Sequence, residues 1–436
     1  MTRPAHRRVA ASDARLGVLF VNTKTEITPI QQVHAAIAAH LDPSRFRVFV
    51  VTPADCDTEA AWDLSPDVTI WRRRLGVSLR ASSLAERLRA LIRNLSLIRD
   101  IADLSLRIRV HRIRIIHTAT TPRDVLMGVT LSAVTGARLV IHWHDTFWGR
   151  YPLLWRIGFR RATRIFAVSE ASKLSLVAVG VPAEKFTVIH NGVDLDRFRP
   201  RTPDPAVRRA LRAAPDGLLV LMPGRLCPGK GQAELLAALA LLRARGLRPT
   251  TLVVGKDDPW STPGRRSHRA HLEALARQLG IDDQVQFSAP RADMPDLMAA
   301  ADVVTVPSWT EPCGLVILET LASGRALLGT TGGGTAELID TEVDGLLVPP
   351  RDSSSLAAAL ERLLTDAALR ADLGARARRK AERCFSTRRM VADAERAYLE
   401  IAQDGAATGV AVASVAGARA GHRAARHPMG VRRPQP

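Results

Sequence analysis

Short runs of consecutive apolar residues recur along the chain, and most of them lead through a polar turn into a stretch with helical periodicity. In the first half they fall at residues 16–21, 46–51, 113–117, 138–145 and 163–169. In the second half they fall at residues 218–222, 251–255, 285–287, 301–306, 326–330 and 345–350. Such continuous runs are typical of strands buried on both faces of a parallel sheet. Strands that alternate with helices predict the α/β class, built from doubly wound Rossmann-like units.

A polar, proline-rich segment from Arg199 to Pro205 interrupts this alternation and is typical of a linker. It divides the strands into two sets. We therefore predict a disordered basic N-terminus at 1–14, a Rossmann-like domain at 15–199 and a second one at 200–390. From residue 405 to 436 the chain is mostly alanine, glycine, arginine and proline, which predicts a disordered tail.

One stretch of the first half is strongly basic. From Arg72 to Arg114 there are twelve arginines and only three acidic residues, and leucines recur there at helical spacing. The apolar positions are Leu84, Leu88, Leu91, Leu95, Ile98 and Ala102. Two interpretations remain open: a helix that covers its own sheet, and a surface that contacts an anionic membrane.

Two glutamates stand eight positions apart in a predicted strand–turn–helix unit. The strand ends near Ser308, Glu311 lies in the turn, and Glu319 lies inside the following helix. Gly314 lets the backbone approach a ligand closely, and the amides of Cys313 to Val316 form a helix N-terminus that can bind an anion. A helix cap with a solvated second glutamate is the alternative.

A glycine-rich turn precedes the first helix of the second half. It carries Gly224, Arg225 and Lys230, and two cations in front of a helix N-terminus suit a diphosphate. The spacing is not that of a P-loop. A basic surface loop is the alternative interpretation.

The predicted strand 138–145 ends in a polar turn that contains His142, His144 and Asp145. Two histidines at i and i+2 share one face of a strand only if Trp143 points the other way. No third ligand is evident nearby, so we predict no metal site. The Asp194-Leu195-Asp196 sequence mimics a metal-binding motif, but it falls between the predicted domains and we do not interpret it as one.

Composition restricts the function classes without choosing one. The 436 residues carry a net charge of +19, which suits nucleic acid, anionic lipid or phosphorylated ligands. Aromatic residues make up only 4%, few for a protein that stacks on bases. Four scattered cysteines favour a reducing cytosol, and no apolar run is long enough to span a membrane.

Several motifs in order resemble those of the retaining, nucleotide-sugar-dependent family-4 (group 1) glycosyltransferases. They are His144-Asp145, Ser169-Glu170, Asn191-Gly192-Val193-Asp194, Gly224-Arg225 with Lys230-Gly231, Pro307-Ser308, Glu311 with Glu319, and Gly333-Gly334 with Glu337. The resemblance implies the GT-B fold, in which two Rossmann-like domains face each other across a cleft. It also implies that a helix at 391–404 crosses back to the first domain. The first loop departs from the family, because Glu26 to Pro29 stand where a glycine pair is usual.

The resemblance also implies roles for individual residues. Arg225 and Lys230 would hold the diphosphate, Glu311 the donor sugar, and His144 would face that sugar from the first domain. The remaining nucleotide-sugar contacts would be Gly224, Cys313, Gly314, Leu315, Val316 and the ribose-binding Glu319.

The implied reaction is retaining transfer of a hexose-type sugar from a nucleoside diphosphate sugar to a hydroxyl acceptor. The acceptor would be a glycolipid, a polysaccharide or a small glycoside precursor, and no metal or other cofactor is implied. We expect a cytoplasmic enzyme, with the stretch from Arg72 to Arg114 as a possible peripheral contact with the inner membrane face. The alternatives are a sugar-nucleotide 2-epimerase of the same fold and a basic nucleic-acid-binding protein.

Overall fold

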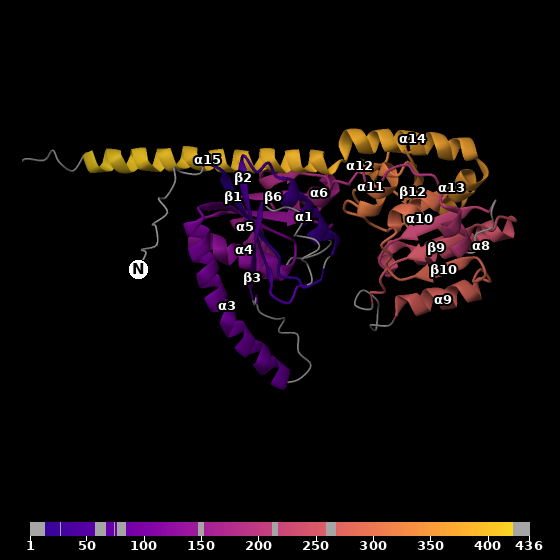
Figure 1. The fold of residues 1–436 in the computed structure, drawn as a ribbon, viewed down its shortest axis with the longest axis horizontal. Helices are drawn as coiled ribbons and strands as arrows, with labels where there is room; N and C mark the ends of the chain where they lie inside the picture. Colours follow the sequence, from indigo (N-terminus) through magenta and orange to yellow (C-terminus); the bar gives the residue numbers. More distant parts are fainter. Residues whose placement is uncertain are drawn as a thin grey trace, which may run out of the picture.

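The structure is a computed structural model that describes residues 14–26, 28–56, 67–73, 75, 84–146, 152–211, 217–258 and 267–421. The side chains of residues 84–96 and 405–421 are outside this description. Two parallel sheets, each covered by helices, lie next to each other along the long axis of the molecule (Figure 1). The predicted architecture of two Rossmann-like domains is confirmed.

The first domain is built on a seven-stranded sheet of order β3-β2-β1-β4-β5-β6-β7, and every neighbouring pair is parallel. Its strands are β1 (Leu16–Val21), β2 (Phe46–Pro53), β3 (Val68–Arg73), β4 (Ile113–Thr118), β5 (Arg138–Trp143), β6 (Arg164–Ala167) and β7 (Phe186–Val188). Its helices are α1 (Pro29–His40), α3 (Leu84–Val110), α4 (Pro122–Thr135), α5 (Leu153–Arg161), α6 (Glu170–Val177) and the 3₁₀ turn η1 (Ala183–Lys185).

The second domain repeats the scheme with a six-stranded parallel sheet of order β10-β9-β8-β11-β12-β13. Its strands are β8 (Leu219–Pro223), β9 (Thr250–Val254), β10 (Val285–Ser288), β11 (Val303–Val306), β12 (Ala326–Thr330) and β13 (Leu346–Val348). Its helices are α7 (Pro205–Ala210), η2 (Pro228–Lys230), α8 (Gln232–Ala244), α9 (His268–Gln278), α10 (Met294–Ala300), α11 (Leu315–Ala322), α12 (Thr335–Leu338), α13 (Ser353–Thr365) and α14 (Ala367–Cys384).

The continuous apolar runs are explained by cores on both faces of each sheet. In β1, Val18 and Phe20 join the core beneath α1, whereas Leu19 and Val21 join the core beneath α3 and α4. All six residues of β1 are buried. Because successive side chains of a strand point to opposite faces, only an uninterrupted apolar run fills both cores.

The last helix, α15 (Thr387–Gly421), leaves the second domain and packs on the first (Figure 1). Met390, Val391 and Tyr398 are buried with β1 and α1. The hydroxyl of Tyr398 lies 2.7 Å from His117 Nδ1 at the core side of β4. The expected crossing helix is therefore present. It continues to Gly421, past residue 404, where the sequence predicts that it ends.

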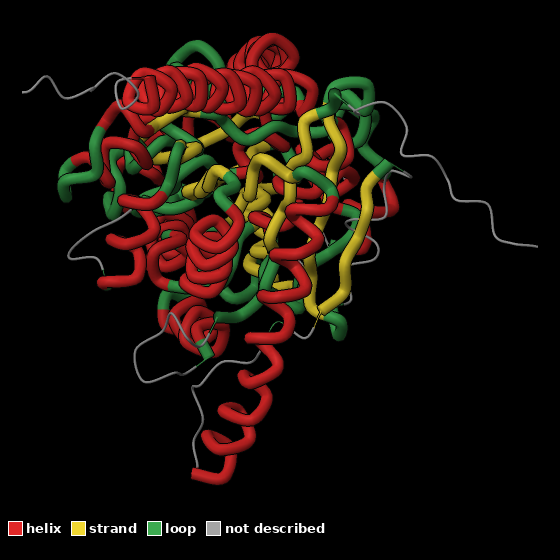
Figure 2. The backbone as a smooth tube through the Cα atoms, turned by 90° about the vertical axis from the view of Figure 1, so that its left-hand side faces the viewer, coloured by secondary structure: helices red, strands yellow, loops and turns green. Residues whose placement is uncertain are grey.

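The predicted basic helix is α3, but its buried side differs from the predicted one. Leu104 and Ile108 are buried, whereas the predicted Ile98 is 69% exposed. Arg72 and Arg73 lie outside α3, on the edge strand β3, which the periodicity did not reveal. The first half of α3 extends away from the body of the first domain (Figures 1 and 2). Among the described helices, none is both long and apolar enough to span a membrane.

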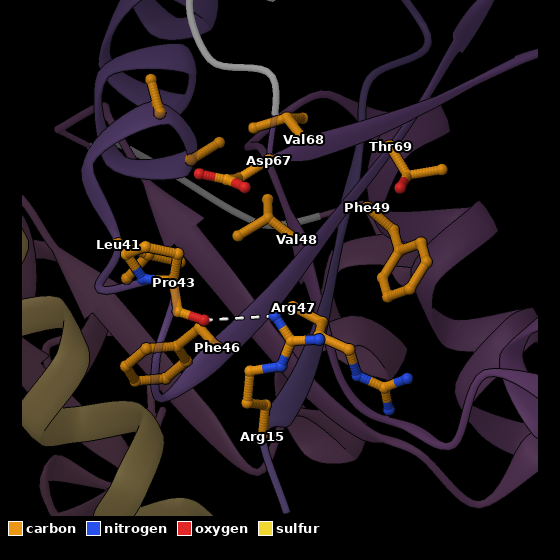
Figure 3. A pocket seen from close by; sticks show the side chains of 12 residues that line it. Arg15, Leu41, Pro43, Phe46, Arg47, Val48, Phe49, Asp67, Val68 and Thr69 are labelled. Carbon is orange, nitrogen blue, oxygen red and sulfur yellow. Dashed lines mark hydrogen bonds between the residues drawn. The ribbon is translucent and has the colours of Figure 1, made fainter. Parts of the chain in front are cut away.

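Strand order reverses at two places, between β1 and β4 and between β8 and β11. In open parallel sheets, ligands bind outside the carboxyl ends of the strands at such switch points. A small pocket of about 180 Å³ lies elsewhere, between α1, β2 and β3 (Figure 3). It is lined by Phe46 and Val68, the first residues of β2 and β3, so it lies toward the amino edge of the sheet, away from the switch point.

Candidate active site between the two domains

The loop after β8 brings Arg225 to the switch point of the second sheet. Gln232 at the start of α8 donates a hydrogen bond of 2.8 Å to the Arg225 carbonyl, which fixes the turn. The guanidinium lies 2.9 Å from the Asp258 carboxylate and its side chain is 62% exposed. The backbone of Arg225 is thus fixed by Gln232, whereas its cationic side chain is open to solvent.

Lys230 ends the same loop and lies deeper. Its Nζ contacts the Glu311 carboxylate at 2.5 Å, and the two side chains are only 22% and 12% exposed. The next residue, Gly231, has φ of +78° and is the N-terminal cap of α8. A Cβ there would lie 2.0 Å from the carbonyl oxygen of Pro307, so only glycine lets the two loops pack this closely.

Glu311 lies in the loop after β11, and three neighbouring residues hold it in place. Besides Lys230, the hydroxyl of Ser308 lies 3.3 Å from the same carboxylate oxygen. The Glu311 carbonyl accepts a hydrogen bond of 2.8 Å from the Gly334 amide. A Cβ at Gly334 would lie 2.1 Å from the Pro312 carbonyl, so the glycine-rich turn 332–334 serves to pack against the Glu311 loop.

Glu319 lies one turn inside α11, as predicted, and its carboxylate makes no hydrogen bond to a described residue. Burial raises its pKa to about 7, against an ordinary value of 4.5, and the nearby Arg197 opposes that shift only in part. A half-buried carboxylate without a partner can accept hydrogen bonds from a ligand.

The N-terminus of α11 provides the predicted donors. Helix α11 begins at Leu315 with Gly314 as its cap, and the amides of Leu315 and Val316 make no hydrogen bond to described residues. Cys313 is buried, and burial raises the pKa of its thiol to about 12, so the thiol stays neutral. A Cβ at Gly314 would lie 2.9 Å from the Glu311 side chain, so Gly314 makes room for that carboxylate.

His144 follows β5 at the carboxyl edge of the first sheet. Its Nε2 lies 3.3 Å from Nε2 of His34, which comes from α1. Burial lowers the pKa of His144 well below its ordinary value, and the neighbouring His34 adds to that effect. His144 is therefore a neutral imidazole at neutral pH.

Asp145 links this edge to the second domain electrostatically. Partial burial raises the pKa of its carboxyl, and Glu311 raises it further, whereas Arg225 and Lys230 lower it. The carboxyl is thus within range of all three second-domain charges. The structure brings together His144, Asp145, Arg225, Lys230 and Glu311, which the sequence singled out separately.

Glu337 makes a contact between the domains that the sequence did not reveal. Its carboxylate accepts hydrogen bonds of 2.7 Å from the amides of Glu170 and Ala171, at the N-terminus of α6 in the first domain. It also lies 3.3 Å from His190 Nε2. Burial opposes ionisation, but these hydrogen bonds outweigh it and lower the Glu337 pKa. Glu337 therefore joins the two domains; the paired motifs Ser169-Glu170 and Gly333-Gly334 were the available signal.

Two further segments that the sequence singled out make local contacts. The Asp194 carboxylate accepts hydrogen bonds of 3.0 Å from the amides of Asp196 and Arg197, so it caps a turn. In the first loop, Glu26 lies 3.0 Å from Lys256 of the second domain. The residue after Glu26, Ile27, lies outside the described residues.

Both halves of the chain match known family profiles. Residues 30–197 match the profile described as Glycosyltransferase Family 4, and residues 204–380 match Glycosyl transferases group 1. The D-inositol 3-phosphate glycosyltransferase of Saccharomonospora viridis is 41% identical over 202 residues, 45% of this chain and 46% of the relative. That of Salinispora tropica is 40% identical over 215 residues, 47% of this chain and 44% of the relative. The chain thus matches less than half the length of these curated relatives.

Solved structures agree with the fold. Anabaena HepE, in complex with UDP and glucose, superposes with a TM-score of 0.71 at 24% identity, over 89% of this chain and 100% of that chain. Sucrose-phosphate synthase from Thermosynechococcus elongatus has a TM-score of 0.71 at 22% identity, with the same coverage. The two profiles match the two domains in chain order, and the fold is that of these solved structures. The chain belongs to the family-4, group 1 glycosyltransferases and has the GT-B fold.

Proposed function

We propose that the protein is a retaining hexosyltransferase that takes a sugar from a nucleoside diphosphate donor and passes it to a hydroxyl acceptor. One observation carries this proposal. Two cations, a carboxylate without a partner and a helix N-terminus lie at the switch point of the second sheet, and the two cations lie within electrostatic range of Asp145, the residue after His144. This is the set of groups that a diphosphate, a ribose and a sugar require.

The diphosphate would lie between Arg225, Lys230 and the amides of Leu315 and Val316. When the bond to the sugar breaks, negative charge develops on the leaving diphosphate, and fixed positive groups stabilise that charge. Lys230 is well placed for this role because Glu311 holds its ammonium group in the half-buried site.

The two glutamates would divide the rest of the donor. Glu319 accepts hydrogen bonds from the ribose hydroxyls, since its carboxylate has no other partner. Glu311 contacts the sugar from the side of Lys230, and His144 contacts it from the first domain. HepE was solved with UDP, which favours a UDP-sugar for the first trials. The relatives' names favour an inositol phosphate as the first acceptor to test.

The decisive experiment measures UDP release from UDP-hexoses with and without a panel of hydroxyl acceptors, including inositol phosphates and glycolipids. A retaining transferase releases UDP at a rate that depends on the acceptor and forms a glycoside with the anomeric configuration of the donor. Isomerisation of the sugar nucleotide without acceptor would instead identify a 2-epimerase. Product with the opposite anomeric configuration would contradict the retaining assignment.

Donor binding should weaken as pH falls below about 7. A pKa raised to about 7 means that Glu319 loses its charge through this range, and the neutral acid is the poorer acceptor for two hydroxyls. Calorimetry with UDP-glucose at pH 8, 7 and 6 measures the effect, because its diphosphate diester does not titrate there. The Glu319→Gln variant should bind with nearly constant affinity, and an equal slope in both proteins would contradict the assignment.

Chelation should leave transfer intact. Arg225 and Lys230 supply the positive charge that a divalent ion provides in other diphosphate sites. The assay compares the initial rate before and after treatment with a strong chelator. A rate that disappears and returns with manganese would show that transfer depends on a metal.

We propose in addition that α3 contacts an anionic membrane surface. Its first half extends from the body of the domain (Figure 2), and this half carries Arg87, Arg89 and Arg93. Each arginine near anionic lipid contributes about 1 kcal/mol at low salt. In a flotation assay, the full chain should float with anionic vesicles at low salt and should stay in the soluble fraction with neutral vesicles.

A matched pair of variants isolates the helix from the basic tails. Replacing the three α3 arginines with glutamine should reduce flotation with anionic vesicles. Replacing Arg376, Arg379 and Arg383, which are exposed on α14, removes the same charge and should leave flotation unchanged. Equal losses in both variants would assign the binding to net charge and not to α3.

A further inference from the structure

Four histidines from three elements pack against one another inside the first domain. His34 comes from α1, His117 from β4, and His142 and His144 from the end of β5. The rings of His34 and His142 are stacked with centroids 5.2 Å apart, and those of His142 and His144 are 4.0 Å apart. Trp143 packs in the opposite core, so His142 and His144 share the face that α1 covers.

The nitrogens of these rings are unevenly satisfied. His117 Nδ1 is paired with the Tyr398 hydroxyl. His34 Nε2 and His144 Nε2 lie 3.3 Å apart. His142 is fully buried, and neither of its ring nitrogens has a hydrogen-bond partner among the described residues. Burying an unsatisfied polar group is costly, so a fully buried imidazole with two free nitrogens requires an explanation.

A hydrogen bond between two neutral imidazoles explains only part of this arrangement. One tautomer of His34 can donate to His144, or the reverse, at the observed separation. This leaves His142 unsatisfied, although it is stacked on one ring and touches the other.

We propose that His34, His142 and His144 bind a divalent transition-metal ion of the zinc class. One nitrogen from each ring lies within 4.8 Å of the others. In a tetrahedral zinc site with Zn–N distances of 2.0–2.1 Å, ligand nitrogens are about 3.3–3.4 Å apart. The Nε2 atoms of His34 and His144 already have this separation, and the His142 ring would have to move closer to both to complete the set.

The donor set determines the class of ion. Three neutral imidazoles suit zinc, copper, nickel or iron, whereas magnesium and calcium require several oxygen ligands. The fourth position of a three-histidine site is left for water or a substrate oxygen. It would face the side of His144, which is the half-buried member of the set.

The proposed metal site includes His144, whose imidazole contacts the donor sugar in the proposed transfer reaction. A bound ion and a donor sugar would therefore compete for His144. That consequence rests on the proposed function, whereas the existence of the site does not, because ion binding is measured without donor or acceptor.

Calorimetric titration of the full-length, chelator-treated protein with Zn²⁺ tests the site directly. We expect one ion per chain to bind more tightly than to any other position. His34→Gln should weaken that binding at least about tenfold, since even second-shell partners of a metal contribute 10–100-fold. His40→Gln is the matched control, because His40 ends the same helix, is exposed, and lies outside the group.

Two further measurements keep the result interpretable. Co²⁺ added to the wild-type protein should give the strong visible absorption of a tetrahedral site, and His34→Gln should abolish it. Zn²⁺ should raise the Tm of the wild type and not of His34→Gln. If His34→Gln does not fold without metal, His144→Gln, at the half-buried end of the group, replaces it. Equal Zn²⁺ affinity in wild type and variants, or only weak octahedral absorption, would mean an adventitious ion only and would overturn the proposal.

Discussion

Replacing Lys230 with alanine is expected to lower kcat/KM by an amount equivalent to about 2–4 kcal/mol of lost transition-state stabilisation. This is the range for removing a group that stabilises developing charge in a transition state. The ammonium group lies beside Glu311 in a site where both side chains are mostly shielded from water. Charge interactions are stronger there than at the surface. Arg225→Ala should fall in the same range, because its exposed guanidinium would meet the proposed diphosphate from the solvent side.

Steady-state rates with donor and acceptor varied in turn measure this loss. Arg243→Ala is the matched control, since Arg243 lies in the last turn of α8, the helix that follows the Lys230 loop, and pairs with Asp283 outside the site. Thermal unfolding of each variant checks that the fold persists. A turnover near that of the wild type for either Lys230→Ala or Arg225→Ala would refute the diphosphate assignment.

Substitutions of Glu319 and Glu311 should have different effects, one on UDP binding and the other on turnover. Glu319→Ala is expected to weaken UDP binding by about 1.5–3 kcal/mol, the contribution of hydrogen bonds to a charged group. Glu311→Ala should leave UDP binding undiminished and lower kcat. The substitution would remove the proposed contact with the sugar, and it also frees Lys230 from a competing carboxylate.

Calorimetry with UDP and rates with the full donor give the two quantities for each variant. Glu361→Ala serves as the control, because Glu361 pairs with Arg245 on the outer face of the second domain. If both site variants lose UDP affinity equally, the ribose and sugar assignments are wrong.

Local sequence placed two pairs of second-domain residues. Arg225 and Lys230 share one loop, and Glu311 and Glu319 share one strand–turn–helix unit, whereas the contact between Lys230 and Glu311 joins positions 81 apart. Gly231 and Gly334 were signals of another kind, since close contacts with the backbone of Pro307 and Pro312 require glycine there. The alternation of apolar runs with helical stretches likewise predicted both sheets, because buried parallel strands need apolar residues on both faces.

Elements at the edges of the sheets were harder to predict. Strand β3 was missed because an edge strand is only half-buried and carries polar residues such as Thr69 and Arg72. In α3 the predicted apolar face included Ile98, whereas the sheet covers the face of Leu104 and Ile108. A helix with leucines on several sides has no unique buried face until its neighbours fix its rotation.

The contacts between distant segments were decided by the tertiary structure alone. The sequence showed His142 and His144 as an isolated pair, and the fold brings His34, 110 positions before His144, into contact with His144. The fold likewise lets the Glu337 carboxylate accept hydrogen bonds from the amides of Glu170 and Ala171. These two residues lie 167 and 166 positions earlier in the chain. The sequence by itself determined which elements form and which loops carry charge. Only the packing of α1 onto the first sheet, and of one domain against the other, decided which of those groups meet, because proximity between such distant positions exists only in the folded chain.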